Sequence, residues 1–168
     1  MQFVLVSACL LGEPVRYDGG HKRSEHAILQ RWLREGRVVA VCPEVAGGLP
    51  TPRPPAEISA GAGGARVLSG AAKVVDARGA DWSAEFVRGA QYALARAEGL
   101  QIQVAVLKEG SPSCGSALSH DGSFTGRTVP RPGVTTALLR QTGIEVFSES
   151  QLEQADALLK RLASADAT

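Results

Sequence analysis

Four short runs of apolar residues constrain the fold of this chain more than any other feature. They are rich in Val and Ile and show little alternation of polar and apolar positions. Runs of this length are typical of strands, and strands that are apolar on both faces occur in parallel sheets covered by helices on each side. The pattern therefore predicts a mostly parallel open sheet. The runs are residues 3–6, 38–41, 102–107 and 144–147.

Helical patterns lie between and after these runs. We expect Asp81 to cap the second helix, and Ser150 with Glu153 to form a capping box at the fourth. Strands that alternate with helices indicate an α/β, Rossmann-like fold with right-handed crossovers and helices on both faces of the sheet. A length of 168 residues fits a single domain, residues 1–168. The helical segments are residues 25–35, 81–98, 134–141 and 152–162.

Two regions interrupt the alternation of strands and helices. Residues 43–65 hold five prolines and five glycines, and residues 110–132 are similar in character. Such segments predict long active-site loops without regular structure. Between them, residues 67–77 are interpreted as a β-hairpin or a pair of strands.

Charge and hydropathy narrow the classes of partner. The formal net charge is +1, so no overall field attracts nucleic acid or an anionic membrane, and no stable nucleic-acid complex is expected. No apolar run is long enough to cross a bilayer, and no secretory signal precedes the first strand. We expect a cytoplasmic protein with a small-molecule partner, and the sequence leaves its oligomeric state open.

Three cysteines share one context. Cys9 and Cys42 follow predicted strands directly, and Cys114 follows the third after a short loop. In open parallel sheets, ligands bind outside the carboxyl ends of the strands, so these cysteines can converge despite their separation in sequence. The alternative is that each is a small buried hydrophobic residue. An odd number of cysteines is a poor disulfide framework, which leaves metal binding or nucleophilic chemistry.

Three thiolates can hold zinc or an iron-sulfur cluster. Zinc usually takes a fourth Cys or a His as ligand. Its cysteine ligands usually occur in pairs such as C-x-x-C, and this chain has no such pair. His21, His26 and His120 are the only histidines, and His26 falls in a predicted surface helix. A cluster held by three cysteines leaves one iron open as a Lewis acid for a soft sulfur atom. The tight cysteine spacing of ferredoxins is absent, so spacing alone does not decide.

Polar residues near the cysteines are candidate catalytic groups. Glu44 comes two residues after Cys42, and a carboxylate near a metal can act as a general base toward water. Asp18 and Ser111 are further candidates, although an aspartate before two glycines can simply form a turn. Ser113 either orients a ligand or caps a helix near Cys114.

The segments that contain these residues resemble the thiouracil desulfurase family. The resemblance implies an oxygen-sensitive 4Fe-4S cluster on Cys9, Cys42 and Cys114. It also implies a non-redox reaction in which water attacks the carbon of a thiolated nucleobase and the free iron takes the sulfur, with Glu44, assisted by Asp18 and Ser111, as the acid/base residue. His120 departs from the family pattern, where an aromatic hydroxyl residue is expected. The matching segments are SACLLG (7–12), RYDG (16–19), CPE (42–44), GGLPTPR (47–53), KEGSPSCG (108–115), DGSFTG (121–126) and GVT (133–135).

Two other hypotheses stay open at this point. Cys9 could be the nucleophile of a metal-free hydrolase or transferase, a role that needs an adjacent base. The protein could instead be a non-catalytic sulfur carrier in which Arg53, Arg127 and Arg131 hold an anionic ligand. These arginines are otherwise expected to be solvated or to brace loops.

Overall fold

A four-stranded sheet forms the centre of the computed structural model, which describes residues 1–168. The strand order is β2-β1-β5-β8, and every pair is parallel. The predicted α/β fold with a parallel sheet is confirmed, because each strand coincides with an apolar run to within two residues. The strands are β1 Val4–Ser7, β2 Val38–Val41, β5 Val104–Leu107 and β8 Glu145–Ser148.

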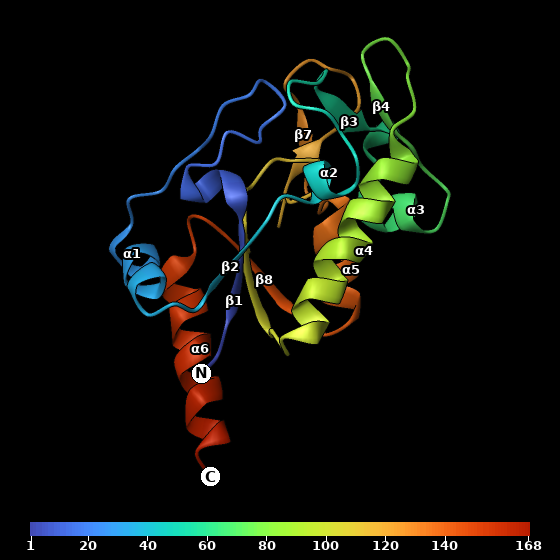
Figure 1. Cartoon of the computed structure of the whole chain (residues 1–168). Coiled ribbons are helices and arrows are strands. Elements are labelled where there is room, and N and C mark those ends of the chain that lie inside the picture. Colours follow the sequence, from blue (N-terminus) through green and yellow to red (C-terminus); the bar gives the residue numbers. More distant parts are fainter.

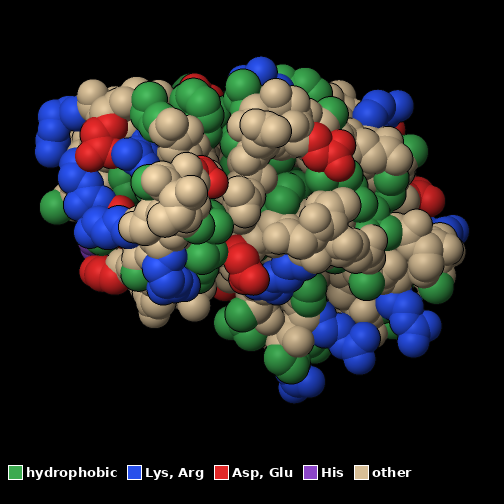
Figure 2. Space-filling view, turned by 90° about the horizontal axis from the view of Figure 1, so that it is seen from below, with side chains coloured by type: hydrophobic (Ala, Val, Ile, Leu, Met, Phe, Trp, Pro, Cys, Tyr) green, Lys and Arg blue, Asp and Glu red, His purple; other side chains and the backbone are tan.

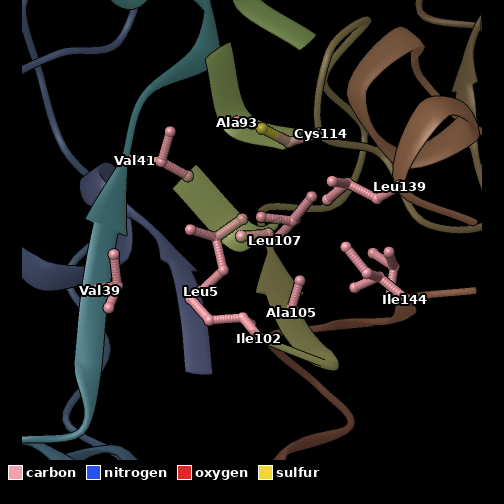
Figure 3. Close-up of a cluster of buried hydrophobic side chains, with 12 residues drawn as sticks. Leu5, Val39, Val41, Ala93, Ile102, Ala105, Leu107, Cys114, Leu139 and Ile144 are labelled. Carbon is pink, nitrogen blue, oxygen red and sulfur yellow. The ribbon is translucent and has the colours of Figure 1, made fainter. Parts of the chain in front are cut away.

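Helices cover both faces of the sheet (Figure 1). On one face, Leu5 and Ala105 belong to a buried cluster with side chains of α4 and α5, part of which Figure 3 shows. On the other face, Val4 and Val6 belong to a cluster with side chains of α1 and α6. Successive strand residues point to opposite faces, so strands covered on both sides have no position for polar side chains. The helices are α1 Ala27–Arg34, α4 Ser83–Gly99, α5 Val134–Gln141 and α6 Leu152–Asp166.

The starts of α1 and α4 differ slightly from the expectation. The α1 helix begins at Ala27, because the ring of His26 caps it by accepting the N–H of Ile28 at 3.1 Å. His26 is therefore a cap and not a mid-helix residue. Asp81 accepts the N–H and the hydroxyl of Ser83, the first residue of α4, but Trp82 is the N-cap of this helix, so the predicted cap is wrong by one position.

The capping box predicted for α6 does not form. The hydroxyl of Ser150 pairs with that of Ser148, and Glu153 pairs with His26 at 3.1 Å. A local contact therefore takes Ser150, and a tertiary contact takes Glu153, away from the capping box. The helix also runs further than expected, to Asp166.

The two regions expected to be irregular hold short elements. The 43–65 region begins with α2 Pro43–Ala46 and includes β3 Ala56–Ile58 and a 3₁₀ turn, η2 Ser59–Gly61. The 110–132 region contains a small hairpin of β6 Ser119–His120 and β7 Thr128–Val129. The predicted absence of regular structure is wrong here because these elements are too short to leave a periodic pattern.

The hairpin expected at residues 67–77 is also wrong. Val67 lies in a short helix, α3 Gly64–Leu68, where it packs into a third buried cluster with Phe86. Only β4 Val74–Asp76 is a strand, and it pairs antiparallel with β3, which precedes α3. A β-branched residue favours strands only weakly, and burial against neighbouring helices outweighs that preference here.

The face of the molecule at which the strands begin has both positive and negative side chains and no continuous patch of one charge. Figure 2 shows Lys and Arg side chains on that face together with Asp and Glu side chains, separated by hydrophobic and uncharged atoms. This matches the net charge of +1. Among the helices, none combines the length and the hydropathy that spanning a membrane requires.

Candidate active site

The three cysteines meet at the carboxyl end of the sheet. Cys9 lies in a 3₁₀ turn, η1 Ala8–Leu11, that follows β1, and Cys42 directly follows β2. Cys114 follows β5 after a loop, and Figure 3 shows it beyond the side chains of Val41 and Leu107. Because β2, β1 and β5 are neighbours in the sheet, all three cysteines line one cavity of about 380 Å³. The predicted convergence is what the structure shows.

Backbone contacts fix the position of each cysteine. The carbonyl of Cys9 accepts the N–H of Gly12 and that of Lys22. The sulfur of Cys42 lies 4.0 Å from the carbonyl oxygen of Val15. The N–H of Cys114 is bound by the Ser111 hydroxyl at 3.1 Å, and its carbonyl accepts the Thr136 hydroxyl at 3.0 Å. The cavity wall that carries the sulfurs is therefore held by hydrogen bonds from all three segments.

The loop that carries Cys114 depends on close backbone approach. A side chain at Gly133 would lie 2.6 Å from the carbonyl oxygen of Pro112, so this position admits only glycine without a shift of the backbone. Gly133 immediately precedes α5, and the N–H of Val134 donates to the same carbonyl. The start of α5 therefore holds this loop against the sheet.

Burial affects the pKa of all three thiols, and a neighbouring thiol affects the pKa of two of them. Burial is the main cause that raises the pKa of each thiol, and at Cys9 the value reaches about 11. Charge on Cys42 raises the pKa of Cys9 and of Cys114 further. Cys42 therefore lies near both other cysteines.

Glu44 projects into the same cavity with both of its carboxylate oxygens engaged. Its Oε1 accepts from Arg53 at 3.2 Å, and its Oε2 accepts the hydroxyl of Ser111 at 3.3 Å. The Ser111 oxygen in turn accepts the N–H of Ser113 and that of Cys114. A carboxylate has about four acceptor positions, so two remain for water or a ligand. Glu44 and Ser111 therefore lie together, as the sequence suggested.

Two other polar candidates occupy different positions. Asp18 is not part of the cavity wall, and its carboxylate closes a turn by accepting the N–H of Gly20 at 2.8 Å. Its catalytic role stays a prediction. Ser113 is fully buried, pairs with the hydroxyl of Thr135 at 2.8 Å and does not line the cavity.

Two residues that the sequence analysis missed shape the loop between β5 and Cys114. Glu109 accepts the N–H groups of Gly110, Ala117 and Leu118 and the hydroxyl of Ser116. Burial alone would raise the pKa of Glu109, but these hydrogen bonds outweigh burial and lower it. Lys108 lines the cavity and pairs with Glu149 at 3.0 Å. The motif KEGSPSCG contains both residues, but the partner of Lys108 is distant in sequence and the Glu109 carboxylate binds mainly backbone groups, which carry no sequence signal.

The donor set fits a cluster better than a single metal ion. The structure contains no group of three or more His, Cys, Asp or Glu side chains close enough to share one metal ion. A mononuclear zinc site would need its sulfurs about 2.3 Å from one point. In an iron-sulfur cluster each thiolate binds a different iron, so three thiols around one cavity are a suitable donor set.

Known proteins resemble this chain over nearly its whole length. The family model of 2-thiouracil desulfurase matches residues 4–151. The uncharacterized protein YbbK of Bacillus subtilis (strain 168) is 44% identical over 149 residues, which cover 89% of this chain and 97% of YbbK.

A solved structure is also similar. It is the [4Fe-4S]-dependent thiouracil desulfidase TudS, which is 49% identical with a TM-score of 0.86, over 95% of this chain and 99% of that one. The predicted fold class is confirmed by this match, and the predicted cofactor is the one named for TudS. Because the family model matches most of this chain, the chain belongs to the 2-thiouracil desulfurase family.

Proposed function

We propose that this protein is a desulfurase that removes sulfur from a thiolated nucleobase such as thiouracil, with a 4Fe-4S cluster held by Cys9, Cys42 and Cys114. The observation that carries the proposal is that these three thiols, from three adjacent strand ends, line one cavity together with Glu44 and Ser111. Membership of the 2-thiouracil desulfurase family supports the substrate class. Three free thiols also suit a reducing compartment such as the cytoplasm.

The cluster, when bound, supplies an iron without a protein ligand, which is a Lewis acid suited to a soft sulfur atom. Glu44 is the general base of the proposal, because its free acceptor positions face the cavity where a water molecule can be held. Ser111 fixes one carboxylate oxygen and the N–H of Cys114 with the same hydroxyl. The proposed base, Glu44, and the proposed cluster ligand, Cys114, are thereby held in a fixed relative position, and a base that is fixed near its target is more effective.

The metal-free nucleophile hypothesis has less support. A cysteine nucleophile needs a lowered pKa and a base within hydrogen-bond reach. Burial raises the pKa of Cys9 to about 11, and no histidine is hydrogen-bonded to its sulfur. The sulfur-carrier hypothesis also loses support at Arg53, which is buried and paired inside the protein.

Anaerobic reconstitution tests the proposal. Iron and acid-labile sulfide are counted per chain, and the loaded protein is then incubated with 2-thiouracil while uracil and sulfide are measured. We expect four irons per chain and many turnovers, and a cluster-loaded protein that releases no uracil would contradict the proposal. A carrier would stop after one equivalent.

Two variants make this test specific. Cys42→Ser should lose the cluster and the activity together, because an alcohol is a poor ligand for iron of this type. Glu44→Gln should keep the cluster but lose turnover. Glu85→Gln is the matched control, because Glu85 also pairs with an arginine, Arg88, at 3.9 Å, yet lies outside the cavity.

A further inference from the structure

Arg53 is unusual among the arginines of this chain because it is buried. Its side chain is 4% exposed, whereas that of Arg88 in the surface pair with Glu85 is 60% exposed. Arginine is rarely buried unless its donors are satisfied. The sequence places Arg53 in a proline-rich loop, where it is expected to be solvated or to brace the loop, and the structure shows that it braces loops.

The guanidinium of Arg53 joins three segments. Its Nε donates to Glu44 at 3.2 Å, and its Nη1 donates to the carbonyl of Pro50 and the hydroxyl of Thr51 at 3.1 and 3.0 Å. Its Nη2 donates to the carbonyl of Val15 at 2.9 Å. The planar guanidinium fixes the angles between these partners, which a lysine ammonium could not do.

Val15 lies in the segment between η1 and α1, here called the cover loop, residues 12–24. Arg53 holds this loop twice, because its backbone N–H also donates to the carbonyl of Tyr17 at 2.7 Å. The same Val15 carbonyl lies next to the sulfur of Cys42. Three residues of the cover loop besides Val15 line the cavity, namely Arg16, Tyr17 and Lys22.

We propose that Arg53 is a positioning residue that couples the closure of the cover loop to the orientation of the Glu44 carboxylate. When Val15 and Tyr17 are docked on Arg53, the guanidinium is held so that Nε directs one oxygen of Glu44, while Ser111 directs the other. The wall of the cavity and the proposed base then form together. This inference rests on the proposed function of Glu44.

A double-mutant cycle tests the coupling on anaerobically loaded full-length protein with 2-thiouracil. The variants are Arg53→Met, Glu44→Gln and the two combined, with Arg88→Met, Glu85→Gln and their double variant as the matched surface cycle. Arg53→Met should lower kcat by about tenfold to hundredfold, whereas in the Glu44→Gln background it should lower kcat by less than about threefold. Arg88 also donates to the carbonyl of Gly47 at 3.1 Å, so the surface cycle is read for coupling between Arg88 and Glu85 in kcat, which should be absent.

Lysine separates charge from geometry at this position. Arg53→Lys keeps the positive charge but offers no planar set of donors, so it should recover only part of the kcat lost in Arg53→Met. Iron and acid-labile sulfide per chain should match wild type in Arg53→Lys. If Arg53→Met fails to fold or to load the cluster, the same cycle with Arg53→Lys decides.

Limited trypsin digestion tests the cover loop without any activity measurement. The loop contains Arg16, Lys22 and Arg23 as cleavage sites, and undocking exposes them. Arg53→Met should speed the first cut within residues 16–23 severalfold, and Arg88→Met should not. An unchanged cleavage rate would overturn the part of the inference that concerns the loop.

The outcomes separate the two proposals. Losses of kcat that multiply fully between Arg53→Met and Glu44→Gln would overturn the positioning role, even if both variants are impaired. Wild-type turnover in Glu44→Gln would instead refute the role of Glu44 in the proposed function. Coupled losses together with faster cleavage support the inference.

Discussion

Two arginine-carboxylate pairs of this protein differ in how many acceptor positions of the carboxylate remain free. Asp156, between α1 and α6, accepts from Arg31, from the indole of Trp32 at 3.0 Å and from Lys160 at 2.9 Å. No residue of this group lines the cavity. Glu44 accepts only one protein donor at each oxygen and faces the cavity.

This difference indicates that the same kind of ion pair, an arginine with a carboxylate, has two different roles in this protein. A buried carboxylate that already binds three donors fastens one helix to another and has little capacity left for a substrate. A carboxylate held at both oxygens, but with positions left open toward a cavity, is oriented and still able to bind a proton or water. The number of donors around each carboxylate, and not burial alone, therefore separates a structural pair from a candidate catalytic one.

The largest effect should come from removing the charge of Glu44. Glu44→Gln is expected to lower turnover of 2-thiouracil by about 10²–10⁴-fold, the usual range for a general base. Its melting temperature should fall as well, because Gln keeps one acceptor oxygen for Arg53, turns an amide N–H toward Ser111 and leaves the buried guanidinium without a counter-charge. Steady-state kinetics and thermal melts check both parts, and a stability loss larger than the activity loss would reverse the comparison.

The reciprocal change at Asp156 should affect stability and not catalysis. Asp156→Asn removes the charge that Arg31 and Lys160 bind, and because both cations are partly or largely exposed, the free energy of unfolding should fall by about 1–2 kcal/mol. Urea denaturation measures this loss. Turnover per loaded cluster should be unchanged at a temperature where the variant is folded, and a drop in kcat would show that the helix pair communicates with the cavity.

Acid should reveal the same contribution in the wild-type protein. Burial alone would raise the pKa of Asp156, but the hydrogen bonds from Arg31, Lys160 and Trp32 outweigh burial and lower it from 3.8 to about 2. Because the folded value is the lower one, this stabilisation is complete above about pH 4 and is lost as the pH falls toward 2, a difference of about 2 kcal/mol. Urea denaturation of the metal-free protein at several pH values measures it, and Asp156→Asn should lack this component.

The smallest effect is expected at Ser111. Ser111→Ala removes one of the two donors that orient Glu44 and frees the N–H of Cys114, so kcat should fall by about tenfold, equal to about 1.4 kcal/mol. Cluster content, measured as iron per chain, shows whether the loss is one of orientation or of cluster binding. Full activity in Ser111→Ala would leave Arg53 as the sole orienting contact.

Much of the fold follows from local pattern. The strands at residues 38–41 and 144–147 could be predicted from their apolar composition, because strands covered on both faces are apolar at successive positions. The helix at residues 134–141 matched α5 because its apolar spacing is set by helix geometry. Short elements such as α3, β6 and β7 escaped prediction, because they are held by tertiary contacts and span too few residues to show a period.

The amino-acid sequence is enough to locate the four strands of the central sheet and to place Cys9, Cys42 and Cys114 after three of them, because an apolar run and its end are local properties of the chain. The burial of Arg53 against Glu44 and the three donors around Asp156 appear only once distant segments have packed together. Each of these outcomes depends on which distant backbone and side-chain groups are left to satisfy a charge once the loops have closed. That balance of burial against hydrogen bonding is a property of the folded chain and leaves no periodic mark on the sequence.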